Sequence, residues 1–283
     1  MGVPYAEVIG DPIGHSKSPL IHKFWLEKLG IEGDYRAEQV SAAGLADHLR
    51  TRRSDADWRG CNVTIPHKTA LQSHLDDVDA LAARIGAVNV VTRAGERLVG
   101  HNSDAAGFLE PLRPLLAKRH LFRLARILGA GGAARAVAHA LWGEGFTLVL
   151  LARDIAKAEA LRAHFDPEHT YVCDLAEFAA PTDFAFDDRD GILDLVVNTT
   201  PLGMAGQPPL AFDFSHVPPG ALVYDLVYDR LETPLLAEAR RRGLATIDGL
   251  HMLVGQAAIA FELFFDVPAP REHDAELREL LTR

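Results

Sequence analysis

A short glycine-rich segment, residues 129–134 with the sequence GAGGAA, most constrains what this chain can fold into. An apolar run ends just before it, a stretch with helical spacing follows, and a second apolar run covers 147–152. The order strand, glycine turn, helix and strand is typical of a βαβ unit. Gly129 permits the tight turn, Gly131 lets the backbone approach a ligand, and small Ala134 allows close helix–strand packing. The unpaired N–H groups at the start of the helix then favour a dinucleotide pyrophosphate. A glycine turn without a ligand is the alternative interpretation.

The end of the second strand of this unit predicts which dinucleotide binds. An acidic residue there holds the ribose of NAD, whereas the 2′-phosphate of NADP requires an arginine. This chain has Ala152-Arg153-Asp154, so no carboxylate occupies the strand end and Arg153 is available to a phosphate. Asp154 would repel a phosphate, but it is also well placed to be the N-cap of the helix that follows. We therefore predict NADP as the cofactor, with NAD as the alternative.

Strand-like and helix-like segments alternate along the chain, which is typical of α/β architecture. A helix is predicted over 18–30, with Ser18 as its N-cap, Pro19 in its first turn and Gly30 at its end. Further helices are predicted to end near Arg53, to follow Pro66 as two short pieces, and to cover 105–118 and 250–265. The acidic segment 174–192 is expected to be a surface loop with a short helix. Strands are predicted at 5–10, 34–40, 59–65, 87–93, 97–101, 193–200, 221–228 and 245–249.

Composition and charge exclude several classes of protein. The formal net charge of −10 argues against a nucleic-acid partner, and no apolar run approaches the roughly 20 residues that span a bilayer. The chain begins without the basic and apolar regions of a signal peptide, so a cytoplasmic protein is expected. Cys61 and Cys173 lie in separate apolar runs and are expected to be reduced, and the 13 histidines show no metal-binding spacing. No metal site is predicted.

Three polar segments lie where predicted strands end, at 15–18, 62–68 and 100–104. Ligands of open α/β sheets bind beyond the carboxyl ends of strands, so these segments are candidates for one binding site. Each also has an ordinary structural interpretation. Ser18 and Asp104 are suitable helix N-caps, and Lys68 suits a solvated first turn.

These segments and five others together resemble the shikimate dehydrogenase family. The matching blocks are GDPIGHSKSP, NVTIPHK, GAVN, GHNSDAAGF, GAGGAAR, NTTPLGM, YDLVY and TIDGLxMLVxQA, in the family's order from about residue 5 to 265. The resemblance implies an oxidoreductase that reversibly reduces 3-dehydroshikimate to shikimate with NADPH, in the biosynthesis of chorismate and the aromatic amino acids. It also implies two domains. Residues 1–104, joined by 250–283, form a mixed-sheet substrate domain, and 105–249 form a Rossmann-type, doubly wound NADP-binding domain.

The resemblance also assigns roles to residues. Lys68 and Asp104 match the catalytic pair. The positions matching substrate contacts are Ser16, Ser18, Asn62, Thr64, Asn89, Tyr228 and Gln256. The positions matching cofactor contacts are Gly129, Ala130, Gly131, Gly132, Ala133, Arg153, Thr199, Gly249 and Met252. A lysine held by a carboxylate is a sensible proton carrier for alcohol oxidation. The expected partner is the small-molecule substrate alone, and the expected assembly is a monomer or homodimer.

The chain departs from the family's pattern at a few positions. The usual Asn-Arg-Thr cofactor clamp is replaced by Ala152-Arg153-Asp154, and His251 stands where glycine is usual. The first departure keeps open an NAD-preferring quinate/shikimate dehydrogenase, although Ser18 favours shikimate because relatives that use quinate often have threonine there. A catalytically silent dinucleotide sensor is a more remote alternative, since such a protein has no need of the Lys68 and Asp104 pair.

Overall fold

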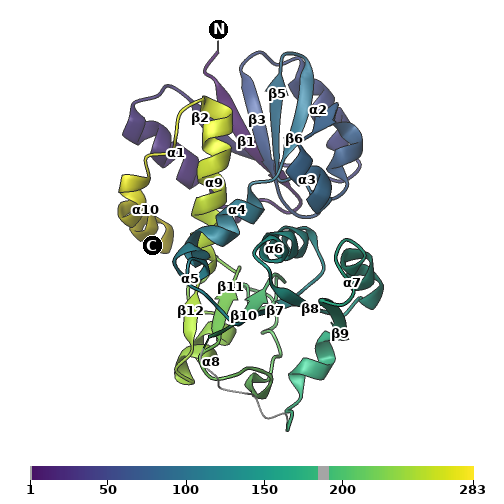
Figure 1. Ribbon diagram of the computed structural model, residues 1–283. Coiled ribbons are helices and arrows are strands. Elements are labelled where there is room, and N and C mark those ends of the chain that lie inside the picture. Colours follow the sequence, from purple (N-terminus) through teal and green to yellow (C-terminus); the bar gives the residue numbers. More distant parts are fainter. Residues whose placement is uncertain (1, 184–190) are drawn as a thin grey trace. The chain divides into compact units, whose positions relative to one another are not determined.

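The computed structural model describes residues 2–183 and 191–283. The chain divides into two compact units, each of which is described by itself. Unit 1 consists of Met1–Gly107 together with Val254–Arg283, and unit 2 of Phe108–Leu253 (Figure 1). The expected domain boundaries, after residues 104 and 249, lie within a few residues of these divisions.

Unit 1 is built on a six-stranded mixed sheet. β1 is parallel to both of its neighbours, β2 and β3, whereas β5 is antiparallel to β3 and to β6. The two-residue β4 was not predicted; it adds an edge parallel to β6. In spatial order the strands are β2 (Asp34–Gln39), β1 (Tyr5–Gly10), β3 (Trp58–Val63), β5 (Val90–Ala94), β6 (Arg97–His101) and β4 (Asp77–Val78).

The helices of unit 1 cover both faces of this sheet. One core joins strand residues such as Ile9 and Val91 to Leu45 of α2 and Ala82 of α3. The other core joins Ala6, Val8 and Tyr35 to Ala260 and Phe264 of α9. The helical elements are α1 (Ser18–Leu29), α2 (Leu45–Arg53), η1 (Leu71–His74), α3 (Ala80–Ile85), α4 (Asp104–Leu109, which ends in unit 2), α9 (Gly249–Phe265, which begins in unit 2), η5 (Arg271–His273) and α10 (Asp274–Thr282).

Only one of the two predicted ends of α1 agrees with the structure. Gly30 ends the helix in the left-handed conformation, with φ 63°, as predicted. The prediction that Ser18 is the N-cap was wrong, because the N-cap is Lys17 and Ser18 is already helical. The side chain of Ser16 instead accepts a hydrogen bond from the Ser18 N–H at 3.3 Å. A Ser-x-Ser sequence thus leaves the cap position ambiguous by one residue.

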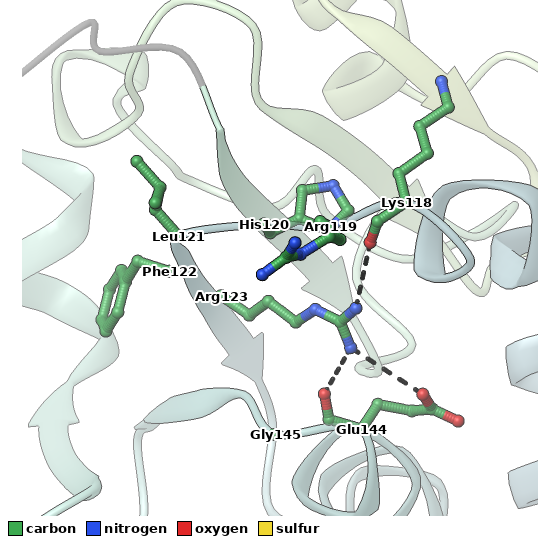
Figure 2. A pocket seen from close by; sticks show the side chains of 8 residues that line it. All are labelled: Lys118, Arg119, His120, Leu121, Phe122, Arg123, Glu144 and Gly145. Atoms are coloured by element: carbon green, nitrogen blue, oxygen red, sulfur yellow. Dashed lines mark hydrogen bonds and ion pairs between the residues drawn. The ribbon is translucent and has the colours of Figure 1, made fainter.

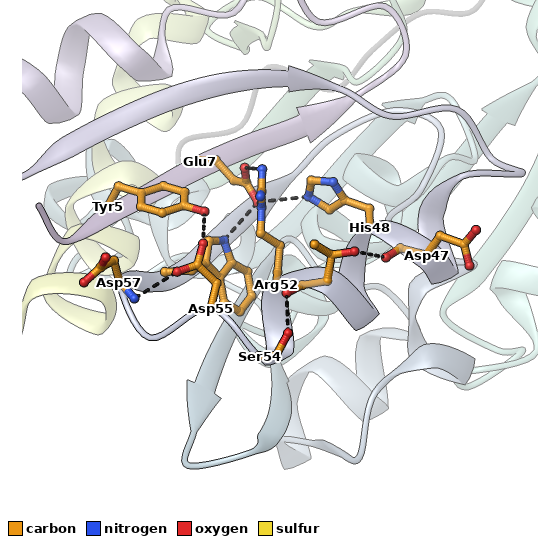
Figure 3. A network of polar contacts seen from close by, with 10 residues as sticks. Tyr5, Glu7, Asp47, His48, Arg52, Ser54, Asp55 and Asp57 are labelled. Carbon is orange, nitrogen blue, oxygen red and sulfur yellow. Dashed lines mark hydrogen bonds and ion pairs between the residues drawn. The ribbon is translucent and has the colours of Figure 1, made fainter. Parts of the chain in front are cut away.

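A buried carboxylate lies on the β1 face that packs against α2. Glu7 is fully buried and accepts two hydrogen bonds from Arg52, at 2.9 and 3.0 Å. Figure 3 shows Arg52 and His48 beside Glu7, and His48 lies 2.9 Å from this carboxylate. The indole N–H of Trp58 donates to the same carboxylate at 2.9 Å. Burial alone would raise the pKa of Glu7, but the bonds from His48 and Arg52 outweigh it, so its pKa is lowered. The network ties β1 to α2.

Unit 2 is built on a six-stranded, fully parallel sheet in the doubly wound arrangement. The chain runs from the central β7 outward to β9 and then returns to β10 on the other side of β7, which creates a topological switch point between β7 and β10. In spatial order the strands are β12 (Ala245–Ile247), β11 (Leu222–Asp225), β10 (Ile192–Asn198), β7 (Phe122–Leu128), β8 (Thr147–Ala152) and β9 (Thr170–Asp174). The predicted fold class, a mixed-sheet domain plus a Rossmann-type domain, is therefore confirmed.

The helices of unit 2 follow the predicted alternation, with one subdivision. The predicted helix 105–118 is divided into α4, η2 and α5, since Pro111 and Pro114 each remove a backbone donor. The short helix expected within 174–192 is η3, whereas residues 184–190 of that segment lie outside the described residues. The elements are η2 (Glu110–Leu112), α5 (Arg113–Leu116), α6 (Gly132–Gly143), α7 (Ile155–Arg162), η3 (Leu175–Ala179), η4 (Phe214–His216) and α8 (Pro234–Arg241).

Candidate active site

An ion pair between Lys68 and Asp104 lies at the centre of the polar residues of unit 1. Lys68 follows β3, and Asp104 is the first residue of α4. The Lys68 Nζ lies 2.6 Å from Oδ2 of Asp104, and their side chains are 17% and 4% exposed. Asp104 therefore does not act as a helix cap, nor is Lys68 a freely solvated side chain. Two residues that are far apart in the sequence form one partly buried proton-donating and proton-accepting unit.

Asn89 holds the other oxygen of this carboxylate. Its Nδ2 donates to Oδ1 of Asp104 and to Oγ of Ser103, both at 2.9 Å. Its Oδ1 accepts from the Ser103 N–H at 2.7 Å, so the orientation of the amide is fixed from both ends. Gln256 of α9 lies at the edge of the same cluster, with its Oε1 3.4 Å from Asn89 Nδ2. The carboxylate is thus oriented by Lys68 on one oxygen and Asn89 on the other.

The loop that carries Asp104 is held by a residue to which sequence reasoning gave no role. The side chain of Asn102 is buried, and its Nδ2 donates to the Ala87 carbonyl at 2.9 Å. Its Oδ1 accepts from the Ala105 N–H at 3.2 Å, which satisfies a donor in the first turn of α4. Asn102 and Ser103 lie beside Asp104 in the block GHNSDAAGF, and that adjacency is the only signal the sequence gave.

Asn62 and Thr64 lie at the end of β3, next to the end of β1. Asn62 accepts a hydrogen bond from the hydroxyl of Tyr35 at 2.6 Å, and its Nδ2 lies 3.4 Å from the Asn89 carbonyl oxygen. Thr64 is held by its N–H to the Ile9 carbonyl at 3.0 Å. The methyl group of Thr64 lies 2.5 Å from where a Cβ at Gly10 would be, so only glycine fits there.

Ser16 and Ser18 lie at the start of α1, in the loop that follows β1. Ser18 is buried, and it is close enough to Tyr35 for its side chain to act on the pKa of that hydroxyl, in the lowering direction. Hydrogen bonds link Lys68, Asp104, Asn89, Gln256 and Asn62. Tyr35 itself was missed, because a tyrosine in a predicted strand looks like an ordinary core residue.

The glycine turn of unit 2 has the features that a dinucleotide phosphate needs. Gly129 has φ 118°, and a Cβ there would collide with the hydroxyl of Thr199. Gly131 is the N-cap of the 12-residue α6 and has no side-chain cap. No heavy atom lies within 4 Å of where its Cβ would be, so the space beside Gly131 is open. The first N–H groups of α6, which have no partner within the helix, are thus available to an anion.

Arg153 and Asp154 follow β8 and have different surroundings. Asp154 is the N-cap of α7, accepting from the Lys157 N–H at 3.1 Å, as predicted from the sequence. Lys157 also places its Nζ 3.3 Å from the same carboxylate, and these bonds lower the pKa of Asp154. Arg153 is exposed, and its guanidinium has no ion-pair partner within the described part of the chain.

A buried carboxylate fixes the loop that carries Thr199. Asp225, at the end of β11, accepts from Asn198 Nδ2 at 2.9 Å and from the hydroxyl of Thr233 at 2.6 Å. Asn198 Oδ1 in turn accepts from the Thr200 N–H at 3.0 Å. Burial raises the pKa of Asp225 above its ordinary value. Strands that contain Asn198 and Asp225 were predicted from the sequence, but the hydrogen bond between these two residues was not.

The remaining candidate residues lie near the end of β11 and the start of α9. Gly249 begins α9 with no space for a side chain, since a Cβ would lie 2.5 Å from the carbonyl oxygens of residues 226 and 227. Met252 is buried, and His251 is exposed. Burial, with a contribution from Asp229, raises the pKa of Tyr228. Among the residues that the structure describes, the side chains of Tyr228 and Met252 form no hydrogen bond with the other candidate residues.

A hollow of about 370 Å³ lies at the opposite end of the central strand of unit 2, where β7 begins and α6 ends. Its basic lining includes Lys118, Arg119 and Arg123, but Arg123 is engaged in donating to the carbonyls of Leu116 and Glu144, at 2.9 and 2.6 Å. Figure 2 shows the Arg123 guanidinium turned towards Glu144. This hollow does not include any candidate site residue.

Two further properties concern the described residues as a whole. They include no group of three His, Cys, Asp or Glu side chains arranged to hold a metal ion. Within residues 2–183 and 191–283, no helix has both the length and the apolar character that crossing a membrane requires.

A mixed-sheet unit with a Lys–Asp pair, followed by a doubly wound unit with a glycine turn, defines the class of α/β oxidoreductases that use a nicotinamide dinucleotide. The family pattern described as "Shikimate dehydrogenase substrate binding domain" matches residues 8–91, and "Shikimate 5'-dehydrogenase C-terminal domain" matches 249–276. Shikimate dehydrogenase (NADP(+)) of Sphingopyxis alaskensis is 49% identical over 98% of this chain and 97% of its own length. The chain belongs to the shikimate dehydrogenase family.

Solved structures of similar proteins agree with this assignment. Shikimate 5-dehydrogenase from Thermus thermophilus, in complex with NADP(H) and shikimate, is 35% identical with a TM-score of 0.81, covering 98% of this chain and 99% of that one. Quinate dehydrogenase from Corynebacterium glutamicum, in complex with NAD, is 30% identical with a TM-score of 0.82 and covers 98% of this chain and 99% of that one.

Proposed function

We propose that this chain catalyses the reversible oxidation of shikimate to 3-dehydroshikimate with NADP⁺ as the hydride acceptor, a step of aromatic amino-acid biosynthesis. The observation that carries the proposal is the Lys68–Asp104 pair at 2.6 Å, held from behind by Asn89, in a chain of this family. A silent dinucleotide-binding protein has no use for such an assembly.

The chemistry assigned to the pair is proton transfer. Oxidation of a secondary alcohol removes a hydride from carbon and a proton from the hydroxyl, and the nicotinamide supplies only the hydride chemistry. We assign the hydroxyl proton to the pair formed by Lys68 and Asp104, which returns it to the carbonyl oxygen in the reverse direction. The two groups share a hydrogen bond of 2.6 Å, so the proton can pass between them.

Substrate recognition is assigned to polar side chains that, except for Tyr228, belong to unit 1. We assign the carboxylate to the hydroxyls of Ser16 and Ser18. The contacts to the carboxylate or the ring hydroxyls are assigned to Asn62, Thr64, Asn89, Tyr228 and Gln256. Such a set discriminates well, because a ligand that lacks one hydroxyl leaves a buried donor or acceptor unpaired. In this assignment unit 1 is the substrate domain.

Cofactor recognition is assigned to unit 2. Residues 129–133 would hold the pyrophosphate, and Arg153 would hold the 2′-phosphate. Thr199, Gly249 and Met252 would lie against the rest of the dinucleotide. The open space beside Gly131 and the unpaired guanidinium of Arg153 fit these groups. Because Asp154 is already bonded to Lys157, its repulsion of a phosphate is reduced.

The proposal is tested by measuring absorbance at 340 nm with shikimate or quinate, each with NADP⁺ or NAD⁺. Shikimate with NADP⁺ is expected to give the highest kcat/KM of the four combinations. A quinate dehydrogenase that uses NAD is the second candidate, favoured by the carboxylate of Asp154 and by the likeness to the NAD-bound quinate dehydrogenase. A higher kcat/KM for quinate with NAD⁺ would contradict the first proposal and support the second.

A further inference from the structure

Tyr35 lies directly behind two of the proposed substrate contacts, and the proton transfer does not use it. It belongs to β2, is fully buried, and pairs with Ala6 of β1. Its hydroxyl donates to Oδ1 of Asn62 at 2.6 Å, and Ser18 is close enough to act on the pKa of the same hydroxyl. The phenol group therefore binds β3 through Asn62 and is a neighbour of Ser18 in α1.

The surroundings of Tyr35 keep its hydroxyl protonated and its ring fixed. Burial raises the pKa of Tyr35 well above its ordinary value, so the group remains a donor at every pH at which the protein works. The ring of His22 stacks on it with 4.0 Å between centroids and 7° between planes. His22 is also fully buried, and neither ring nitrogen has a partner among the described residues, so burial lowers its pKa to about 3. The imidazole ring that stacks on Tyr35 is therefore uncharged.

The hydroxyl of Tyr35 determines which end of the Asn62 amide can face a ligand. With the amide as placed, Oδ1 receives the Tyr35 proton and Nδ2 lies 3.4 Å from the Asn89 carbonyl oxygen. A flipped amide would place Oδ1 against that carbonyl, and two acceptors would then face each other. The Tyr35 bond and the Asn89 carbonyl thus select the same orientation. The second N–H of Asn62 is left as a donor for a ligand.

We propose that Tyr35, a neighbour of Ser18, is a positioning residue for substrate binding, which acts through Asn62 without touching the substrate. The inference rests on the proposed function, because it takes Asn62 as a contact of shikimate. It assigns to a core tyrosine of β2 the task of fixing the donor geometry at the end of β3. Loss of the Tyr35 hydroxyl should therefore weaken the binding of shikimate but change neither the binding of the cofactor nor the rate of the chemical step.

The test compares Tyr35→Phe with the matched variant Tyr5→Phe. Tyr5 is also a buried tyrosine of unit 1, but its hydroxyl donates to Asp55 at 2.6 Å and, in the described part of the chain, forms no hydrogen bond with a candidate site residue. Loss of one hydrogen bond to a buried acceptor predicts that Tyr35→Phe raises KM for shikimate about five- to twentyfold. We expect kcat and KM for NADP⁺ to stay within about twofold, and Tyr5→Phe to leave all three constants within about twofold.

A double-mutant cycle separates positioning from a general effect on packing. If Tyr35 acts through Asn62, its substitution loses most of its effect once the amide has been removed. In an Asn62→Ala background, Tyr35→Phe is therefore expected to change KM for shikimate by less than about twofold. The inference would be overturned if Tyr35→Phe raised KM for shikimate equally in the unchanged and the Asn62→Ala backgrounds. It would also be overturned if Tyr35→Phe lowered kcat, raised KM for NADP⁺ and lowered Tm in parallel.

The remaining outcomes distinguish the inference from the function on which it rests. Shikimate turnover by the unchanged protein, with an unchanged KM in Tyr35→Phe, overturns the inference alone. Absence of shikimate turnover by the unchanged protein overturns the proposed function and the inference with it. If Tyr35→Phe does not fold, NMR of the unchanged protein replaces it. Shikimate is then expected to shift the side-chain amide signals of Asn62 and the ring signals of Tyr35, and unmoved signals would overturn the inference.

Discussion

Arg153 and Asp154 show how neighbouring residues of opposite charge can have separate roles. The carboxylate of Asp154 caps α7 and is close to the ammonium of Lys157, whereas Arg153 is exposed and has no ion-pair partner in the described chain. A cap residue accepts from backbone N–H groups, so its charge is already compensated locally. The repulsion expected between Asp154 and a 2′-phosphate is thereby reduced.

The first prediction concerns cofactor choice. Arg153→Ala removes the charged hydrogen bonds assigned to the 2′-phosphate, so KM for NADP⁺ is expected to rise about 10- to 100-fold. KM for NAD⁺, which lacks that phosphate, is expected to change less than about twofold, and steady-state kinetics with both cofactors provides the internal control. Equal changes in the two constants would show that Arg153 does not read the phosphate.

At the scale of the elements, a buried ion pair joins β1 to α2. Glu7 points to the same face of β1 as Tyr5 and Ile9, whose side chains are part of the core. The strand pattern alone therefore predicts an apolar residue at this position. Its partners, Arg52 and His48, are supplied by a helix about 40 residues later. Sequence reasoning located both elements but could not locate the ion pair, since nothing local indicates which distant arginine reaches a strand carboxylate.

The second prediction concerns the pH dependence of stability. The pKa of Glu7 is lowered from its ordinary value of 4.5, so the folded protein binds fewer protons than the unfolded chain in that range. The stabilisation is fully present above the ordinary value and is lost as the pH falls through the folded pKa. Glu7→Gln is expected to lower the free energy of unfolding at pH 7 by about 3 kcal/mol, because Arg52 loses its buried partner.

Urea denaturation between pH 3 and 7 checks this prediction. The variant is expected to lose less stability than the unchanged protein over the acid range. Glu96→Gln, in an exposed turn, is the matched control and is expected to behave as the unchanged protein. An acid dependence of Glu7→Gln as steep as that of the control would show that Glu7 does not contribute to it.

The third prediction concerns the glycine turn before α6. Gly129→Ala forces an L-residue into φ 118° and against Thr199, so unfolding free energy is expected to fall by about 2 kcal/mol or more and KM for NADP⁺ to rise. Gly143, the last residue of the same helix, has open space around it, and Gly143→Ala is expected to stabilise by about 0.5 kcal/mol. Thermal unfolding of both variants is the measurement. A neutral Gly129→Ala would contradict the steric account.

Over the whole molecule, the sequence predicted elements and their order better than it predicted contacts. The fold class and most strands and helices were predictable, because hydrophobic period and glycine placement are local signals. The two-residue β4 was missed, since so short a strand has no periodicity. The N-cap of α1 was misplaced by one residue because Ser16 and Ser18 compete for the role. The candidate site residues were identified through ordered blocks of sequence.

What could not be predicted are the residues that hold the site in place. Tyr35, Asn102 and Asp225 each bond to a candidate residue or to its loop, yet each belongs to a pattern that also describes ordinary core or loop positions. Their roles depend on strand order and on distances between segments far apart in the sequence. These are tertiary facts, and they appear only once the two sheets are assembled.

The central claim concerns what the intact chain does, and turnover of shikimate by Lys68→Ala tests it most directly. Removing the proton carrier is expected to lower kcat with NADP⁺ about 10²- to 10⁴-fold. Lys23→Ala is the control, since Lys23 forms only an exposed ion pair with Asp34 and is expected to keep full activity. If Lys68→Ala instead kept kcat within about threefold of the unchanged protein, the Lys68–Asp104 pair would not be the proton-transfer unit.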